Sequence, residues 1–137
     1  MGERMMKIHI TAGDCLNEIL TKKYPDDTFI PFGEAMITGG YTAKLFSEEF
    51  MQERADTHNV SLEIYKKKLQ GFLSFLTDIK SYKSVTLWFG DEPFCQANVK
   101  AVLQTLKGYG YQGELVLNTV IEETGDLIKR EVLQGVK

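Results

Sequence analysis

The stretch Ser84–Phe89 (SVTLWF) is nearly all apolar or β-branched, and Gly90 follows it directly. Such a run is typical of a strand buried on both faces, as the central strands of parallel sheets are. Pro93 suits the first position of a helix, which makes Glu92 the expected N-cap, and Gly108 is expected to end that helix. A buried strand followed by a helix is therefore the unit from which we predict the fold.

The same unit recurs on both sides of this stretch. Strands that alternate with helices imply an α/β fold in which helices cover both faces of a mostly parallel sheet, with right-handed crossovers. We expect a three-layer, Rossmann-like arrangement. The further strands are expected at Met6–Thr11, Thr28–Phe32 and Glu114–Val120, and the further helices at Cys15–Lys22, from Ser47 to about His58, and at Ser61–Ile79.

The length and composition indicate one domain. The chain has 137 residues, and hydrophobic residues make up 43% of them, which is enough for one packed core. We expect that core to span about residues 6–121. For the tail, residues 122–137, the sequence fits both a helix and an added edge strand.

The net charge of −3 argues against a nucleic-acid partner, because phosphate binding requires a basic surface. The densest basic run, Lys66–Lys68, falls within a predicted helix and is interpreted as its solvated face. The sequence contains no signal-peptide core and no run of about 18 apolar residues, so we expect a cytoplasmic protein with no membrane span.

Polar side chains follow several of the predicted strands. Ligands of open α/β sheets bind beyond the carboxyl ends of the strands. Two helix N-termini, after Gly13 and after Gly90, are expected to point free amides at the same region, which favours an anion. The candidate site residues are His9, Asp14, Glu34, Arg54, Asp91, Glu92 and Gln96.

We interpret His9 and Glu34 as the candidate catalytic groups. His9 suits general acid or base chemistry, since the unperturbed pKa of histidine is about 6.5. Arg54 would clamp a bound anion and Gln96 would orient it. The ligand class that fits is a nucleotide or a phosphate ester, and the sequence assigns no cofactor.

The carboxylates of Asp14, Asp91 and Glu92 are placed with the ligand-binding set, but three or more carboxylates repel an anion. A divalent metal such as Mg²⁺, held by Asp14, Glu34 and Glu92, would resolve that conflict, because hard cations take oxygen ligands. The anion and metal hypotheses therefore depend on each other.

Each candidate also has a structural interpretation. Asp14 can be only the N-cap of the helix that follows it, and His9 can be a satisfied buried histidine. Arg54 can pair with a neighbour such as Glu53 or Asp56, with little effect on the free energy of unfolding.

The two cysteines raise a redox alternative. Cys15 and Cys95 have no metal-ligand spacing and are most simply small buried hydrophobes. Both fall in the first turn of a predicted helix, where the helix dipole lowers a thiol pKa. A transient disulfide would require their Cα atoms to lie within about 7 Å.

The familiar enzyme motifs are absent. No GxGxxG follows the first strand, and the sequence contains neither GxSxG nor HExxH. The segment Gly39–Lys44 lacks the spacing of a phosphate loop.

Four blocks of the sequence, in order, resemble the uncharacterised bacterial family known as domain of unknown function 1835. The resemblance implies a Rossmann-like fold and a shared polar site at His9, Asp14, Glu34, Arg54 and Gln96, with no assigned reaction. The blocks are His9–Asp14, Glu34–Gly39, Phe50 with Arg54-Ala55, and Leu87–Phe89 with Phe94–Gln96. The chain departs from the family pattern at Cys15, Glu92 and Gly40, where Ser, Asp and Pro are usual.

Two functions are expected from these residues. The first is a domain, catalytic or not, that binds a small anionic ligand. The second is a non-catalytic regulatory or protein-interaction domain, in which the polar residues only hold the loops. An exposed edge strand or the tail would also allow a homodimer.

Overall fold

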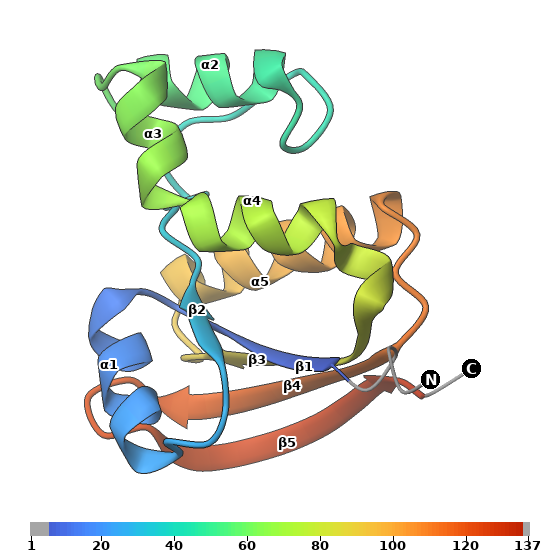
Figure 1. Ribbon diagram of the computed structural model, residues 1–137. Coiled ribbons are helices and arrows are strands. Elements are labelled where there is room, and N and C mark those ends of the chain that lie inside the picture. Colours follow the sequence, from blue (N-terminus) through green and yellow to red (C-terminus); the bar gives the residue numbers. More distant parts are fainter. Residues whose placement is uncertain (1–5, 136–137) are drawn as a thin grey trace.

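The computed structural model describes residues 6–135, which form an α/β fold around one five-stranded sheet (Figure 1). The α/β class and the mostly parallel sheet are confirmed. The elements in chain order are β1 (Met6–Thr11), α1 (Asp14–Lys23), β2 (Phe29–Pro31), α2 (Glu48–Thr57), α3 (Leu62–Lys68), α4 (Gln70–Thr77), η2 (Ile79–Ser81), β3 (Tyr82–Phe89), α5 (Pro93–Gly108), β4 (Glu114–Ile121) and β5 (Asp126–Gln134).

The strand order is β2-β1-β3-β4-β5, so β3 is the middle strand. It pairs in parallel with β1 and with β4, and β1 pairs in parallel with β2. Val85, Leu87 and Phe89 are fully buried on one face of β3, and Trp88 is buried on the other. The central strand predicted from the SVTLWF run is confirmed.

The tail contains an edge strand in its described part, residues 122–135, and its last two residues lie outside the described range. β5 pairs antiparallel with β4, and a short turn that ends at Gly125 joins the two strands. Gly125 has a φ of +75° and donates its amide hydrogen to the carbonyl of Ile121 at 2.7 Å. Glycine suits this position because positive φ is strained for residues with a Cβ.

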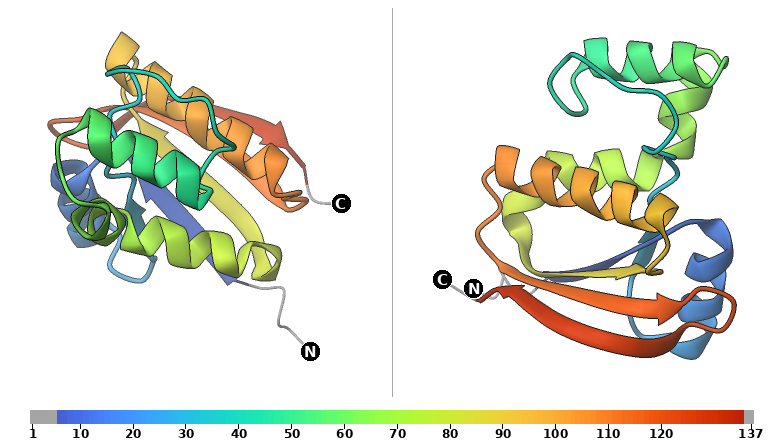
Figure 2. Two further views of the ribbon diagram at one scale, coloured as in Figure 1. Left: turned by 90° about the horizontal axis from the view of Figure 1, so that it is seen from above. Right: turned by 180° about the vertical axis from the view of Figure 1, so that it is seen from behind.

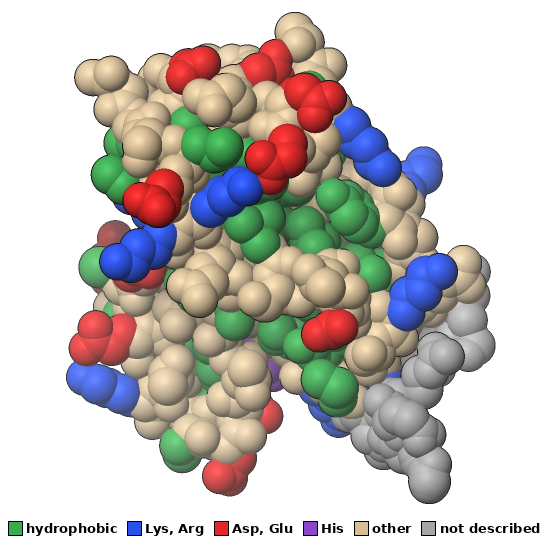
Figure 3. Space-filling view, turned by 45° about the horizontal axis from the view of Figure 1, so that its top comes forward, with side chains coloured by type: hydrophobic (Ala, Val, Ile, Leu, Met, Phe, Trp, Pro, Cys, Tyr) green, Lys and Arg blue, Asp and Glu red, His purple; other side chains and the backbone are tan. Residues whose placement is uncertain are grey.

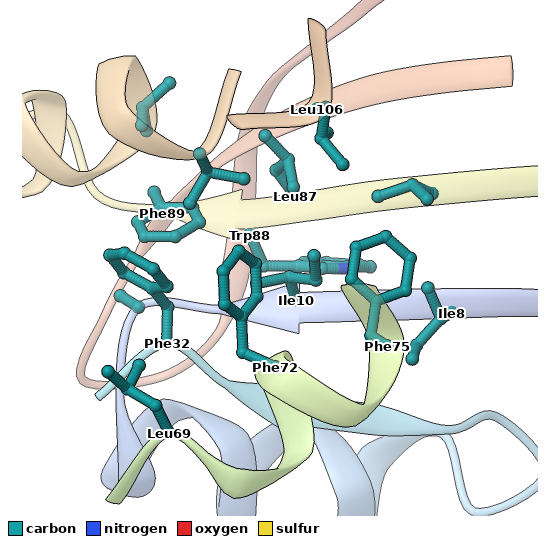
Figure 4. Close-up of a cluster of buried hydrophobic side chains, with 14 of the residues drawn as sticks. Ile8, Ile10, Phe32, Leu69, Phe72, Phe75, Leu87, Trp88, Phe89 and Leu106 are labelled. Carbon is teal, nitrogen blue, oxygen red and sulfur yellow. The ribbon is translucent and has the colours of Figure 1, made fainter. Parts of the chain in front are cut away.

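The two faces of the sheet are covered differently. Figures 1 and 2 show α4 and α5 side by side over one face, with α2 and α3 stacked beyond α4. Phe72 and Phe75 of α4 pack on this face against Ile10 and Leu87, in the core drawn in Figure 4. The other face carries Trp88, whose ring contacts Tyr24 at the end of α1.

The helix predicted over Ser61–Ile79 is wrong in one respect, because it is broken. Leu69 has a φ of −105° and a ψ of 13°, and it ends α3 and begins α4. Leu69 is fully buried, and a Cβ at Gly71 would lie 3.3 Å from Cγ2 of Ile30. The break therefore lets α4 approach β2 closely, and the continuous 3.6-residue period of the sequence hides it.

One of the predicted helix caps is wrong. Gly13, and not Asp14, is the N-cap of α1, so Asp14 is the exposed first residue of that helix. Glu92 does occupy the N-cap position of α5, but its side chain accepts no capping hydrogen bond. Ser47 caps α2 as expected, because its hydroxyl accepts from the amide of Phe50 at 3.2 Å.

Charges of both signs are spread over the surface. Figure 3 shows acidic and basic side chains interspersed around a patch of hydrophobic ones. No helix formed by residues 6–135 combines the length and the apolar character that a membrane crossing requires.

Candidate functional site

A cavity of about 400 Å³ lies beyond the carboxyl ends of β1 and β2. It is bordered by the loop after β1, the loop after β2, the turn between α2 and α3, and α3 itself. The lining residues are Ala12, Gly13, Phe32, Gly33, Glu34, Ala35, His58, Val60, Tyr65 and Lys68.

Glu34 and Arg54 form a buried ion pair at the base of this region. Both side chains are 0% exposed. Arg54 donates from Nε to Glu34 Oε2 at 2.9 Å and from Nη2 to Glu34 Oε1 at 3.0 Å. This two-pronged geometry is the strongest form of the arginine–carboxylate contact.

Three further donors complete the coordination of the Glu34 carboxylate. The hydroxyl of Tyr65 donates to Oε2 at 2.5 Å, and the amide of Ala35 donates to Oε1 at 2.8 Å. Nε2 of His58 lies 2.6 Å from Oε1. Five hydrogen bonds therefore meet on one carboxylate.

These contacts fix the ionisation of the cluster. Burial by itself would raise the pKa of Glu34, but the hydrogen bonds from Arg54, Tyr65, Ala35 and His58 lower it to about 2. Burial and the adjacent Glu34 carboxylate raise the pKa of Tyr65, so its hydroxyl stays protonated and donates. Glu34 is a permanent anion at neutral pH, which makes it a poor proton donor or acceptor and an effective anchor.

The anchor fixes the orientation of His58. Because Glu34 Oε1 can only accept, Nε2 of His58 carries the hydrogen. The neighbouring Nη2 of Arg54, 3.2 Å from Nε2, can then only be a close contact. Nδ1 is left as the acceptor of the neutral ring, and the His58 side chain is 24% exposed.

The loop after β2 is pinned at several points. Arg54 also donates to the carbonyls of Ala35 and Gly40, at 3.0 and 3.1 Å. Asn98 of α5, which is fully buried, donates to the carbonyl of Glu34 at 2.7 Å and accepts from the amide of Met36 at 2.8 Å. The loop is therefore held to both α2 and α5.

Two glycines allow the chain to approach this closely. Gly39 has a φ of +70°, and a Cβ there would lie 2.7 Å from Cγ2 of Thr57. A Cβ at Gly33 would lie 2.9 Å from the backbone oxygen of Lys68. Both contacts bring the loop against the helices that carry Arg54 and Lys68.

The cavity lining is electropositive overall. Arg54 balances the charge of Glu34, and Lys68 forms no ion pair with the residues that the structure describes. Gly13, the N-cap of α1, also borders the cavity, and the acidic residue Asp14 lies in the first turn of that helix, where it partly offsets the positive end of the helix dipole.

The structure brings together only part of the predicted site. Glu34 and Arg54 are in direct contact, which replaces the interpretation that Arg54 pairs with Glu53 or Asp56. Asp91, Glu92 and Gln96 do not line this cavity, and Gln96 donates to the carbonyl of Gly90 at 3.0 Å. Asp14 follows Gly13 at the rim but is not among the lining residues either.

His9 lies in an aromatic cluster away from the cavity. Nε1 of Trp88 donates to His9 Nδ1 at 2.9 Å, and the imidazole stacks on Phe29 with ring centroids 4.5 Å apart. Burial lowers the pKa of His9, although Asp27 at 3.8 Å partly opposes that effect and Lys7 adds to it. The arrangement is that of a satisfied, neutral core histidine.

Cys95 does not have the environment expected for a reactive thiol. Both thiols are free, Cys15 exposed and Cys95 buried. Sγ of Cys95 donates to Oε2 of Glu122 at 3.0 Å. Burial and this carboxylate raise the pKa of Cys95 to about 12, so the expectation of a lowered thiol pKa is wrong there.

Metal ligands do not gather within residues 6–135. No group of three or more His, Cys, Asp or Glu side chains in that part of the chain is placed to hold an ion. The predicted oxygen ligands Asp14, Glu34 and Glu92 are thus not assembled, and Glu34 is fully occupied by Arg54 and the other donors.

Sequence reasoning missed His58, Tyr65, Lys68 and Asn98. The sequence marked His58 only as the end of a helix and Lys68 as solvated surface, and Tyr65 fell within the predicted helix Ser61–Ile79 without a role of its own. Asn98 had a usable signal, because it is a polar residue beside Val99 on the apolar face of a helix.

Comparison of the chain with protein-family models, with curated proteins and with solved structures finds no match.

Proposed function

We propose that the protein binds a small anionic ligand, a nucleotide or a phosphate ester, in the cavity beyond β1 and β2. One observation carries this proposal: among residues 6–135, Glu34 is the only carboxylate that lines the cavity, and buried Arg54 neutralises it, while Lys68 also lines the cavity and forms no ion pair with a described residue. An anion there meets net positive potential.

This charge balance removes the conflict that the sequence raised. An excess of carboxylates was expected to repel an anion unless a metal intervened. Glu34 is paired, and Asp91 and Glu92 lie outside the lining. The proposal therefore includes no divalent metal.

His58 supplies the chemistry that the cavity offers. Its ring is held by Glu34 through Nε2, so Nδ1 is the nitrogen left to accept a proton from a ligand or, when protonated, to donate one. Glu34 acts as a positioning residue, because its carboxylate reaches the ligand only through His58.

We keep the membership of the uncharacterised family, and a cytoplasmic location in a bacterium, as part of this proposal. The paired Glu34 and Arg54 are two of the positions on which the resemblance rests. That family has no assigned reaction, so the membership adds no chemistry.

The proposal is tested by titrating the protein with inorganic phosphate and with a nucleoside monophosphate, by calorimetry and by thermal shift. The variant Lys68→Met should weaken binding about tenfold, the effect of removing one charge-assisted contact. Lys67→Met is the matched control, since Lys67 is also an exposed lysine of α3 but does not line the cavity.

The proposal fails if neither probe binds, or if the Lys67 variant weakens binding as much as the Lys68 variant does. Absence of binding would favour the second function, a regulatory or interaction domain without a small ligand. The saturated hydrogen bonding of Glu34 favours that alternative, because a carboxylate with five donors serves structure well.

A further inference from the structure

The two edges of the sheet differ in length and chemistry. β2 is three residues long and ends at Pro31, which lacks an amide hydrogen. β5 is nine residues long, and no strand within residues 6–135 pairs with its outer edge. An unpaired strand of this length is a template for another strand.

Four large apolar side chains of β5 are exposed. The exposed fractions are 53% for Leu127, 55% for Ile128, 55% for Val132 and 44% for Leu133. They lie as two pairs on either side of the charged segment Lys129–Glu131. Exposed apolar side chains along an open edge indicate an interaction surface.

We propose that the outer edge of β5 pairs antiparallel with β5 of a second copy of the chain. The two-fold axis passes through Arg130, perpendicular to the sheet, so that one continuous sheet runs through both copies. The occupant is a second copy because Lys129 and Glu131 of β5 would each meet the opposite charge in an antiparallel copy of the same strand.

The symmetry restricts the register. Residues opposite each other in an antiparallel pair point to the same face, and side chains alternate along a strand. The axis must therefore pass through a residue and not between two. An axis at Lys129 would set that lysine opposite itself and Leu127 opposite Glu131, whereas an axis at Glu131 would set Lys129 opposite Leu133.

An axis at Arg130 also sets one basic residue opposite itself, but it is the one axis of the three that pairs both Lys129 and Glu131 with the opposite charge of the second copy. Lys129 faces Glu131 of the second copy on either side of the axis. Ile128 and Leu133 are the extra residues at the two register shifts of β5, so regular pairing is limited to the segment between them. Lys129 Nζ is already 3.6 Å from Glu131 Oε1 within one chain, so both side chains lie on one face. The two lysines and two glutamates would form an alternating cluster on that face, and the two Arg130 side chains would lie on the other face at the axis.

The backbone limits which strands can add here. The register between β4 and β5 shifts on both sides of the segment Lys129–Glu131. Such irregularities and central charges prevent a long, flat edge from accepting arbitrary strands. The central segment can pair with a strand that places a glutamate opposite Lys129 and a lysine opposite Glu131. A second copy of β5, running antiparallel, does so.

The test is a charge exchange, followed by sedimentation velocity over a concentration series. The variant Lys129→Glu places two glutamates opposite each other at both symmetric positions, and Glu131→Lys places two lysines there. Each single variant should weaken the dimer about tenfold or more, and the double variant should restore it. Lys100→Glu, an equal charge change at an exposed residue of α5, should leave the dimer intact.

Mixing the two single variants provides the sharpest measurement. One chain then carries two glutamates and the other two lysines at positions 129 and 131, so a heterodimer should form where each variant alone is monomeric. Circular dichroism of each variant establishes that it is folded. A monomeric wild-type protein, or single variants that dimerise like the wild type, would overturn the proposal, as would a mixture without heterodimer.

Discussion

The two histidines of the described chain have opposite environments. His58 donates to a buried, permanently ionised carboxylate at 2.6 Å and lines a cavity. His9 accepts from an indole at 2.9 Å, stacks on a phenyl ring, and lies in the aromatic cluster. The nearest carboxylate to His9, that of Asp27, is 3.8 Å away and 50% exposed.

The difference teaches that the partner, and not the histidine, decides the role of the ring. Five donors fix the Glu34 carboxylate, so Nε2 of His58 carries the hydrogen and the tautomer of the neutral ring is defined. The half-exposed carboxylate of Asp27 gives little energy at that distance. His9 is held by Trp88 and by packing, which suits stability and leaves no reacting group.

Of the three changes that test this contrast, Arg54→Met should have the largest effect on the free energy of unfolding. It leaves the Glu34 carboxylate buried without its counter-charge, and such a loss costs about 3–5 kcal/mol of the free energy of unfolding. Urea denaturation measures the change. The double variant Glu34→Leu with Arg54→Met removes both charges and should recover most of the loss.

A loss below about 1 kcal/mol for the single variant would mean that water reaches the pair and that Glu34 does not anchor the cluster.

The sequence predicted the fold better than the site for a local reason. Strand runs such as SVTLWF and a cap such as Ser47 are encoded by neighbouring residues, and the structure confirms both. The pairing of Glu34 with Arg54 joins residues twenty positions apart, so only tertiary structure reveals it. Both residues were singled out by type, but neither was assigned the other as partner.

The choice between the histidines failed for a related reason. His9 lies within a predicted strand, near the carboxyl end at which ligand sites are common, whereas His58 lies where a helix is predicted to end and no sequence pattern marks it as a site residue. Nothing local in the sequence shows that the chain after β2 folds back to bring Glu34 onto His58.

The second prediction concerns the contribution of the Glu34 carboxylate to the pH dependence of the free energy of unfolding. The folded pKa of Glu34 is about 2 against an ordinary value of 4.5, so the folded state holds this proton less tightly than the unfolded state. The stabilisation from the ionised carboxylate is complete above pH 4.5 and is lost as the pH falls to 2. The variant Glu34→Gln should have a shallower slope there, by at most about 1.4 kcal/mol per pH unit.

Denaturation measured at a series of pH values between 5 and 2 supplies both slopes. Equal slopes for the two proteins would show that the Glu34 carboxylate is not the group that loses its hydrogen bonds in acid.

The third and smallest effect concerns His9 and lies at higher pH. Burial lowers its folded pKa below the ordinary 6.5, so the unfolded chain binds the proton more readily. Stability from the neutral ring is therefore present above pH 6.5 and decreases as the pH falls below that value. His9→Gln keeps a side-chain oxygen that can accept from Trp88 but removes the titration, so the variant should lose less stability than the wild type between pH 7 and 5. Identical pH dependence in this range would mean that the imidazole of His9 is hydrated when protonated, and the contrast between a core histidine and a cavity histidine would then have to be abandoned.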